Sequence, residues 1–177
     1  ITGNMGRPPD IQYSEMLGRP KDDPLVVERV EALWEILKNV EPRAYQDALD
    51  VVPRLAEDGH TLVMSTGYRS DIATSQLEVV GLRRYFDFIL GHDPPIVKGG
   101  LHMEEIKKKY GLTSEEMGEI SIVGDGTGDM QMGQGYTKRL FGIDRIGNSQ
   151  ALITAGALKV FPNLVEFYNY FTGESIS

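Results

Sequence analysis

The stretch Ile120–Met132 constrains the fold more than any other part of the chain, because a short apolar run changes there abruptly into glycine and aspartate. The run through Val123 has the composition of a buried parallel strand, and Gly124 and Asp125 follow it at once. In open α/β sheets, the loops that follow the carboxyl ends of the strands are the usual ligand sites. The stretch therefore predicts a parallel α/β sheet whose central strand ends at a binding loop.

Two carboxylates in this loop, Asp125 and Asp129, are candidate metal ligands. A turn that Gly124, Gly126 and Gly128 make flexible separates them, so both can converge on one point. Converging carboxylates repel each other unless a cation lies between them, and oxygen ligands without Cys or His nearby favour a hard cation. We therefore expect Mg²⁺, which proteins commonly hold through one or two carboxylates plus a substrate phosphate.

Two other interpretations of the loop stay open. Asp125 and Gly126 alone can form a tight turn, with Asp129 capping the next helix through its side-chain oxygen. Gly124 and Gly126 after a strand also match the start of a dinucleotide-binding fingerprint, but Asp129 stands where that pattern needs its third glycine. A carboxylate there would repel a pyrophosphate unless a metal intervened, which weakens the nucleotide interpretation.

The composition limits the classes of function that the chain can have. Its 177 residues, 41% of them hydrophobic, suffice for one domain with a core and a small appended lobe. A net charge of -8 argues against nucleic acid as a partner, and the basic run Lys107–Lys109 is typical of a solvated helix end. Cysteine is absent, which excludes disulfides and Cys-ligated zinc. No apolar run reaches the roughly 20 residues of a membrane span, so we expect a soluble, cytoplasmic protein with no membrane partner.

Apolar spacing, with Gly and Pro between the apolar segments, predicts alternating strands and helices. Strands are expected at residues 61–65, 86–90, 120–123, 139–143 and 158–161, and helices at residues 23–39, 50–58, 70–80, 103–110, 163–171 and from about residue 148. Residues 1–22 are expected to be loop, with at most a short helix at residues 10–17. We expect the helix at residues 50–58 to start near Asp50, with Pro53 in its first turn, and the helix at residues 70–80 to be capped by Ser70. Strands separated by single helices pair in parallel, so the expected fold is a doubly wound sheet with its site at the strand carboxyl ends.

Three short motifs follow one another at these strand ends: Ser65-Thr66-Gly67, then Lys98 with two glycines after it, then Gly124–Asp129. In this order and spacing they resemble the haloacid dehalogenase-like hydrolase superfamily, most of whose members are Mg²⁺-dependent phosphatases. The resemblance covers the chain from about Glu41 to its end. It implies an α/β fold with a doubly wound, Rossmann-like parallel sheet of this family's type and a small N-terminal helical cap segment.

The resemblance implies phosphate-binding roles for residues of the first two motifs. Ser65, with Thr66 as the adjacent alternative, would bind a phosphoryl oxygen through its hydroxyl group, and Gly67 would belong to the same binding turn. Lys98 would neutralise the phosphate and the nucleophile, as a catalytic and substrate-binding residue. Taken alone, Ser65 is typical of a turn residue and Lys98 of a solvated lysine.

For the third motif, the resemblance makes Asp125 a catalytic metal ligand and Asp129 a second ligand, direct or through water. One feature of the family has no match in the chain. The family's nucleophile is an aspartate that ends the first strand, within a pair of aspartates one residue apart. Asp10 lies between prolines and a polar stretch, and Asp22 and Asp23 follow no apolar run, so none of them is expected to end a buried strand.

We therefore expect a family member that lacks its first strand and its nucleophile. Residues 1–41 would form a partial helical cap segment, including Gly6 and Arg7, and residues 42–177 the α/β core. The chain begins with Ile1, which is not an initiator residue, so we expect a missing N-terminal segment or a second chain to complete the sheet. The 177-residue chain by itself is expected to be inactive.

The leading hypothesis is a Mg²⁺-dependent phosphatase that hydrolyses a small phosphorylated metabolite. It would act through an aspartyl-phosphate whose nucleophile lies outside this chain. The small cap segment favours a small substrate over a macromolecule. The alternative is a non-catalytic domain that keeps this fold for binding or assembly. A receiver-like or nucleotide-binding module is a third possibility, and it would need its phosphate site elsewhere in the chain.

Overall fold

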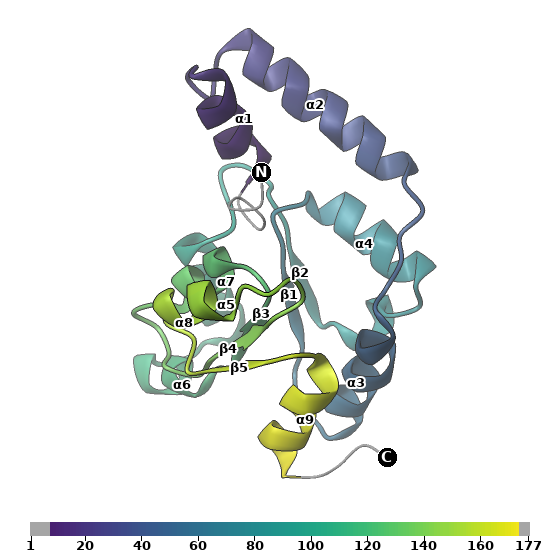
Figure 1. The fold of residues 1–177 in the computed structure, drawn as a ribbon, viewed down its shortest axis with the longest axis vertical. Helices are drawn as coiled ribbons and strands as arrows, with labels where there is room; N and C mark the ends of the chain where they lie inside the picture. Colours follow the sequence, from purple (N-terminus) through teal and green to yellow (C-terminus); the bar gives the residue numbers. More distant parts are fainter. Residues whose placement is uncertain (1–7, 174–177) are drawn as a thin grey trace. The chain divides into compact units, whose positions relative to one another are not determined.

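The computed structural model describes residues 8–173 (Figure 1). These residues divide into two compact units. Unit 1 consists of the described residues up to Arg43 together with Leu62–Lys98. Unit 2 consists of Ala44–Thr61 and the described residues from Gly99 onward. Gly6 and Arg7 of the predicted cap segment lie outside the described residues. The division into a cap segment 1–41 and a core 42–177 stays a prediction.

Unit 1 begins with two helices, α1 (Pro9–Leu17) and α2 (Pro24–Asn39), which pack against each other. The start of α2 follows from its sequence. The Asp23 carboxylate accepts a hydrogen bond from the Leu25 N–H at 2.9 Å, and proline occupies the first helical position, where no N–H is needed. The helix boundary predicted at residue 23 is therefore confirmed.

The remainder of unit 1 is a parallel strand pair with its connecting helix. Strand β1 (Val63–Ser65) pairs with β2 (Phe88–Leu90), so that Ser65 lies opposite Leu90. Between them the chain forms α4 (Ser70–Val79) and the short 3₁₀ helix η2 (Arg83–Tyr85). Because the pair is parallel, the loops after Ser65 and after Leu90 leave the same end of the two strands.

Unit 2 contains a three-stranded parallel sheet in the order β3-β4-β5. Its strands are β3 (Ile122–Gly124), β4 (Leu140–Ile143) and β5 (Lys159–Phe161). Its helices are α3 (Gln46–Glu57), α5 (Gly100–Tyr110), α6 (Ser114–Glu119), α7 (Thr127–Gly133), α8 (Ser149–Thr154) and α9 (Leu164–Thr172). Within this unit, α5, α7 and α8 lie on one side of the sheet, and α3 and α9 lie together on the other (Figure 1). The parallel pairing predicted from the sequence is confirmed.

Aromatic side chains fill the space between this sheet and α9. Phe141 of β4 and Phe161 of β5 contact Phe167 of α9, with ring centroids 5.3 and 5.8 Å from it. Leu55 of α3 packs against the same cluster. Burying large apolar side chains is the main favourable term in folding, so this cluster anchors α3 and α9 to the sheet.

Two helices of unit 2 differ from expectation. Helix α3 begins at Gln46 rather than near Asp50, so Pro53 lies in the helix interior and not in its first turn. That prediction was wrong because it gave the proline more weight than the apolar spacing, which continues back to Tyr45. Helix α6 was not predicted, although Thr113 and Glu116 form a capping box at its start that the sequence spells out.

The described strands leave four strand edges without a strand neighbour, and two of them belong to β1 and β3. Within the described part of the chain, β1 pairs with β2 alone and β3 pairs with β4 alone. This arrangement is compatible with a sheet that lacks one strand, which stays a prediction. None of the described helices has both the length and the apolar content that crossing a membrane requires.

Candidate functional site

The turn after β1 carries the predicted phosphate-binding residues. Ser65 is the last residue of the strand, and the Thr66 N–H donates to the Leu90 carbonyl at 2.9 Å. The Thr66 hydroxyl oxygen accepts a hydrogen bond from the Tyr68 N–H at 3.1 Å. Thr66 therefore stabilises the turn that contains Gly67, and its O–H hydrogen stays available to donate.

The loop after β2 packs directly on this turn. A Cβ atom at Gly91 would lie 2.1 Å from the Ser70 nitrogen, so only glycine allows the two backbones to approach this closely. The Ser70 N–H donates to the Asp93 carboxylate at 3.3 Å. The prediction that Ser70 caps α4 was wrong, since Arg69 occupies the N-cap position without a side-chain cap bond and Asp93 supplies the acceptor from the neighbouring loop.

Lys98 lies between β2 and α5 and is the last residue of unit 1. The next residue, Gly99, has φ 137° and forms the N-cap of α5. A positive φ of this size is strained for any residue with a side chain, which explains one of the two glycines after Lys98. Lys98 therefore follows β2, in the order that the sequence predicted.

The turn between β3 and α7 carries the two predicted metal ligands of unit 2. Asp125 follows the last residue of β3 and is exposed, whereas Asp129 is 8% exposed in the first turn of α7. The Gly126 N–H donates to Oδ2 of Asp129 at 2.9 Å. A Cβ atom at Gly124 would lie 2.4 Å from Cγ of Asp129, so the carboxylate fits only because residue 124 is glycine. Asp129 therefore does take part in a helix cap, as one of the open interpretations expected.

The donor set of this turn fits Mg²⁺. It offers carboxylate oxygens without nitrogen or sulfur, which hard cations prefer. Within residues 8–173 no group of three or more His, Cys, Asp or Glu side chains is placed to hold a metal. Two carboxylates with water and a substrate phosphate suffice for Mg²⁺, whereas an all-protein cage would need more ligands.

The loop after β4, which the sequence did not predict as part of the site, makes a hydrogen bond to the Asp125 backbone. Nδ2 of Asn148 donates to the Asp125 carbonyl at 3.0 Å. The carboxylate of Asp144, directly after β4, accepts the N–H groups of Gly147, Asn148 and Ser149 as well as the Ser149 hydroxyl. These bonds, led by that of Ser149, lower the pKa of Asp144 to about 2. An aspartate directly after a strand and before a Gly-Asn-Ser turn was the signal that could have found this loop.

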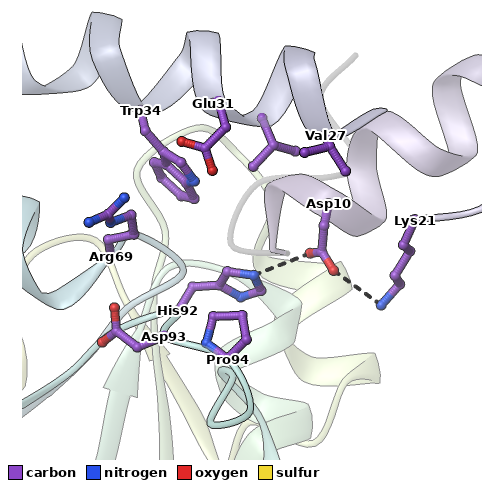
Figure 2. Close-up of a pocket in the computed structure, with 10 residues that line it drawn as sticks. Asp10, Lys21, Val27, Glu31, Trp34, Arg69, His92, Asp93 and Pro94 are labelled. Atoms are coloured by element: carbon purple, nitrogen blue, oxygen red, sulfur yellow. Dashed lines mark ion pairs between the residues drawn. The ribbon is translucent and has the colours of Figure 1, made fainter. Parts of the chain in front are cut away.

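Unit 1 also contains a cavity of about 350 Å³ that the sequence did not predict (Figure 2). It lies between α1, α2 and the loops after β1 and β2 and is lined by Asp10, Lys21, Val27, Val30, Glu31, Trp34, Arg69, His92, Asp93 and Pro94. Cavities of this size hold small metabolites. Asp10 lies in the first turn of α1, so it does not end a strand, as expected from its sequence context.

The predicted site residues thus fall into two sets. Ser65, Thr66, Gly67 and Lys98 belong to unit 1, at the carboxyl ends of β1 and β2, and Asp125 and Asp129 belong to unit 2, at the carboxyl end of β3. Ser65 and Gly67 share one turn, and the two aspartates share another.

Comparisons with known proteins identify the family that this arrangement resembles. The sequence model of the haloacid dehalogenase-like hydrolases matches residues 4–143. No curated protein matches the sequence. Three solved structures illustrate the similarity in fold. A predicted phosphatase from Clostridium acetobutylicum has a TM-score of 0.78 at 17% identity, over 95% of this chain and 78% of that one. A haloacid dehalogenase-like hydrolase from Streptococcus pneumoniae has a TM-score of 0.76 at 17% identity, over 96% of this chain and 79% of that one. A phosphatase of this family from Thermococcus onnurineus has a TM-score of 0.59 at 18% identity, over 95% of this chain and 88% of that one.

Proposed function

The chain belongs to the haloacid dehalogenase-like hydrolase family, and from this membership we propose that it is a Mg²⁺-dependent phosphatase acting on a small phosphorylated metabolite. The observation that carries the proposal is the turn between β3 and α7. There Gly124 makes room for the buried Asp129 carboxylate beside the exposed Asp125. Two carboxylates of this kind support the proposal, because proteins commonly bind Mg²⁺ through one or two carboxylates together with a substrate phosphate.

In this proposal Asp125 and Asp129 hold the cation. Bound Mg²⁺ would supply positive charge to the phosphate oxygens and to the negative charge that develops in the transition state. Asn148 limits the movement of the Asp125 backbone through its hydrogen bond to the carbonyl. A metal ligand that already has its position before the reaction does not have to reorganise during the reaction. This preorganisation lowers the activation free energy.

The residues of unit 1 would bind the phosphoryl group. Ser65 and Thr66 offer hydroxyl donors at the end of β1, and the backbone of Gly67 can approach a phosphate closely because no side chain intervenes. Lys98 would carry the positive charge that stabilises the equatorial oxygens. The size of the cavity in unit 1 supports a small substrate.

We also propose that the attacking carboxylate comes from outside residues 1–177, where it would form an aspartyl-phosphate. The sequence lacks the family's pair of aspartates. The edges of β1 and β3 that have no strand neighbour among the described residues support the addition of a strand. The second candidate, a non-catalytic domain, gains support from the absence of a third metal-binding side chain near Asp125 and Asp129 within the described part of the chain.

The test compares the 177-residue chain with the product of the complete open reading frame. Both are assayed for phosphate release from p-nitrophenyl phosphate and from small phosphomonoesters, with Mg²⁺ and with EDTA. We expect Mg²⁺-dependent release by the complete product, lowered on the order of 10²-fold or more by Lys98→Ala, with little change in its melting temperature. A folded complete product that hydrolyses none of these esters would favour the non-catalytic candidate.

A further inference from the structure

The cavity of unit 1 contains polar atoms that no residue of the described chain satisfies. His92 is 6% exposed, and its Nδ1 atom is buried without a hydrogen-bond partner among residues 8–173. Oδ1 of Asp10 is buried in the same condition, 3.5 Å from Nε2 of His92. An unsatisfied buried polar atom costs roughly 1–3 kcal/mol, so both atoms point to an occupant that is not part of the described chain.

Oδ1 of Asp10 is a carboxylate oxygen and accepts hydrogen bonds. Nε2 of His92 faces the Asp10 carboxylate (Figure 2), and Nδ1 is an acceptor when the ring carries its single hydrogen on Nε2. Glu31 of α2 lines the cavity, and neither an ion pair nor a hydrogen bond joins it to another described residue. The Asp93 carboxylate accepts the Ser70 N–H and has no cationic partner in the described part.

The two cations that line the cavity each pair with a carboxylate. Lys21 forms an ion pair with Oδ2 of Asp10 at 3.4 Å. The Nε and Nη2 atoms of Arg69 donate to the two carboxylate oxygens of Asp71 at 3.1 and 2.9 Å. Three carboxylates (Asp10, Glu31 and Asp93) and two cations (Lys21 and Arg69) line the cavity, so the charge of its described lining is negative. Glu31 and Asp93 are exposed, and neither pairs with a cation of the described part.

From these contacts we infer that the cavity binds a small organic ammonium, a primary amine on a short chain. An ammonium group offers three N–H donors and one positive charge, which complement the acceptors and the unpaired carboxylates. The apolar wall of Val27, Val30 and Trp34 suits the carbon chain. This site goes beyond the proposed phosphatase activity, since binding requires no turnover.

The location also suggests a use for the site. Arg69 and His92 lie on the loops that leave the same end of the β1–β2 pair as Ser65. If the occupant is the organic part of the substrate, the substrate class is the phosphate ester of an amino alcohol. This last step rests on the proposed function, whereas the ammonium site does not.

Trp34 reports binding directly, because it is the only tryptophan of the chain and lines the cavity. The probes are 3-amino-1-propanol, the uncharged 1,3-propanediol and the anion 3-hydroxypropionate, titrated at neutral pH and constant ionic strength. We expect a saturable change in Trp34 fluorescence with the amine, and weaker or undetectable binding of the other two.

Two charge-removing variants and one control complete the experiment. Glu31→Gln and Asp93→Asn should each weaken amine binding roughly tenfold, the loss expected for a charge-assisted hydrogen bond. Glu28→Gln is the matched control, since Glu28 is on the same helix and does not line the cavity. The inference would be overturned if the amine did not bind, if the diol bound equally well or if the anion bound more tightly. It would also be overturned if both variants bound the amine as wild type does. Phosphate release is measured in a separate assay, so a failure of the phosphatase proposal can be distinguished from a failure of amine binding.

Discussion

Gly124 and Asp129 form the tightest fit in the candidate metal site. A methyl group at residue 124 would lie 2.4 Å from the Asp129 carboxylate carbon and 2.5 Å from its Cβ atom, which is too close for either group to keep its position. The glycine therefore fixes where the carboxylate lies, and it also explains why the apolar strand changes to glycine before its first acidic residue.

We predict that Gly124→Ala displaces Asp129 and destabilises the protein by about 1–3 kcal/mol, the usual cost of overpacking a filled site. Urea denaturation measures the loss. Gly118→Ala is the control, because a Cβ atom at Gly118 meets no atom within 4 Å and alanine favours the helix. Equal stability of the two variants would show that Asp129 moves aside at no cost.

Asp144 makes stability depend on pH in the acid range. Its pKa in the folded chain is lowered from the ordinary value of 3.8 to about 2, because the Ser149 hydroxyl and the N–H groups of Asn148, Gly147 and Ile146 donate to the carboxylate. A lowered folded pKa stabilises the protein fully above the unfolded value, and the contribution is lost as the pH falls through the folded value.

We therefore predict that Asp144→Asn destabilises the protein at about pH 6 and that its disadvantage shrinks as the pH falls from about 4 toward 2. Urea midpoints of wild type and variant at a series of pH values measure the difference. Asp22→Asn, at an exposed aspartate without a recorded partner among the described residues, should leave the pH dependence unchanged. A constant difference between wild type and Asp144→Asn over this range would refute the linkage.

At the scale of elements, Asp47 connects α3 to two other segments of unit 2. Its carboxylate accepts hydrogen bonds from Arg145, at 2.8 and 3.1 Å, and from the Leu164 N–H at the start of α9, at 2.8 Å. Desolvation pushes the pKa of Asp47 up, but the bonds from Arg145 and Leu164 outweigh it and hold the pKa below its ordinary value. The pair is mostly buried, with 16% and 12% of the Arg145 and Asp47 side chains exposed.

Asp47→Ala should cost about 2 kcal/mol of unfolding free energy, since it leaves Arg145 and the Leu164 N–H without their acceptor. Asp50→Ala on the same helix is the control, because an exposed hydrogen bond from Gln46 is all that Asp50 accepts from the described residues. Both changes raise helix propensity equally, so the difference between their denaturation curves isolates the connection. If the denaturation curves of the two variants coincided, the contacts of Asp47 would not contribute to the stability of α3.

The sequence predicted elements whose signals are local. Asp23 and Pro24 marked the start of α2, and the change at Gly124 marked the end of β3, because capping and chain reversal depend on neighbouring residues. It did not predict features that depend on distant residues. Asp93 caps α4 from another loop, and Pro53 is accommodated inside α3, whose burial and connections outweigh one missing hydrogen bond.

The same distinction applies to the functional sites. Asp125, Asp129 and Ser65 follow strands directly, so their positions could be predicted from local pattern. The brace from Asn148 to Asp125 joins residues far apart in the chain, and the cavity around His92 brings together residues from four segments of unit 1. Such groupings arise from tertiary packing, and no spacing in the sequence encodes them.

For the molecule as a whole, the proposed function depends on Mg²⁺ binding at the turn between β3 and α7. Family membership supports the fold and the reaction class, and the chemistry of Asp125 and Asp129 supports the cation. With two protein carboxylates, we expect weak binding, with Kd on the order of 1 mM, or about 4 kcal/mol.

Titration calorimetry with MgCl₂ measures this binding without a substrate or a nucleophile. We expect saturable Mg²⁺ binding by the wild-type chain, loss of that binding in Asp125→Asn, and unchanged binding in Asp50→Asn, which changes an acidic residue of the same unit outside the turn. Equal Mg²⁺ binding by wild type and Asp125→Asn would contradict this expectation.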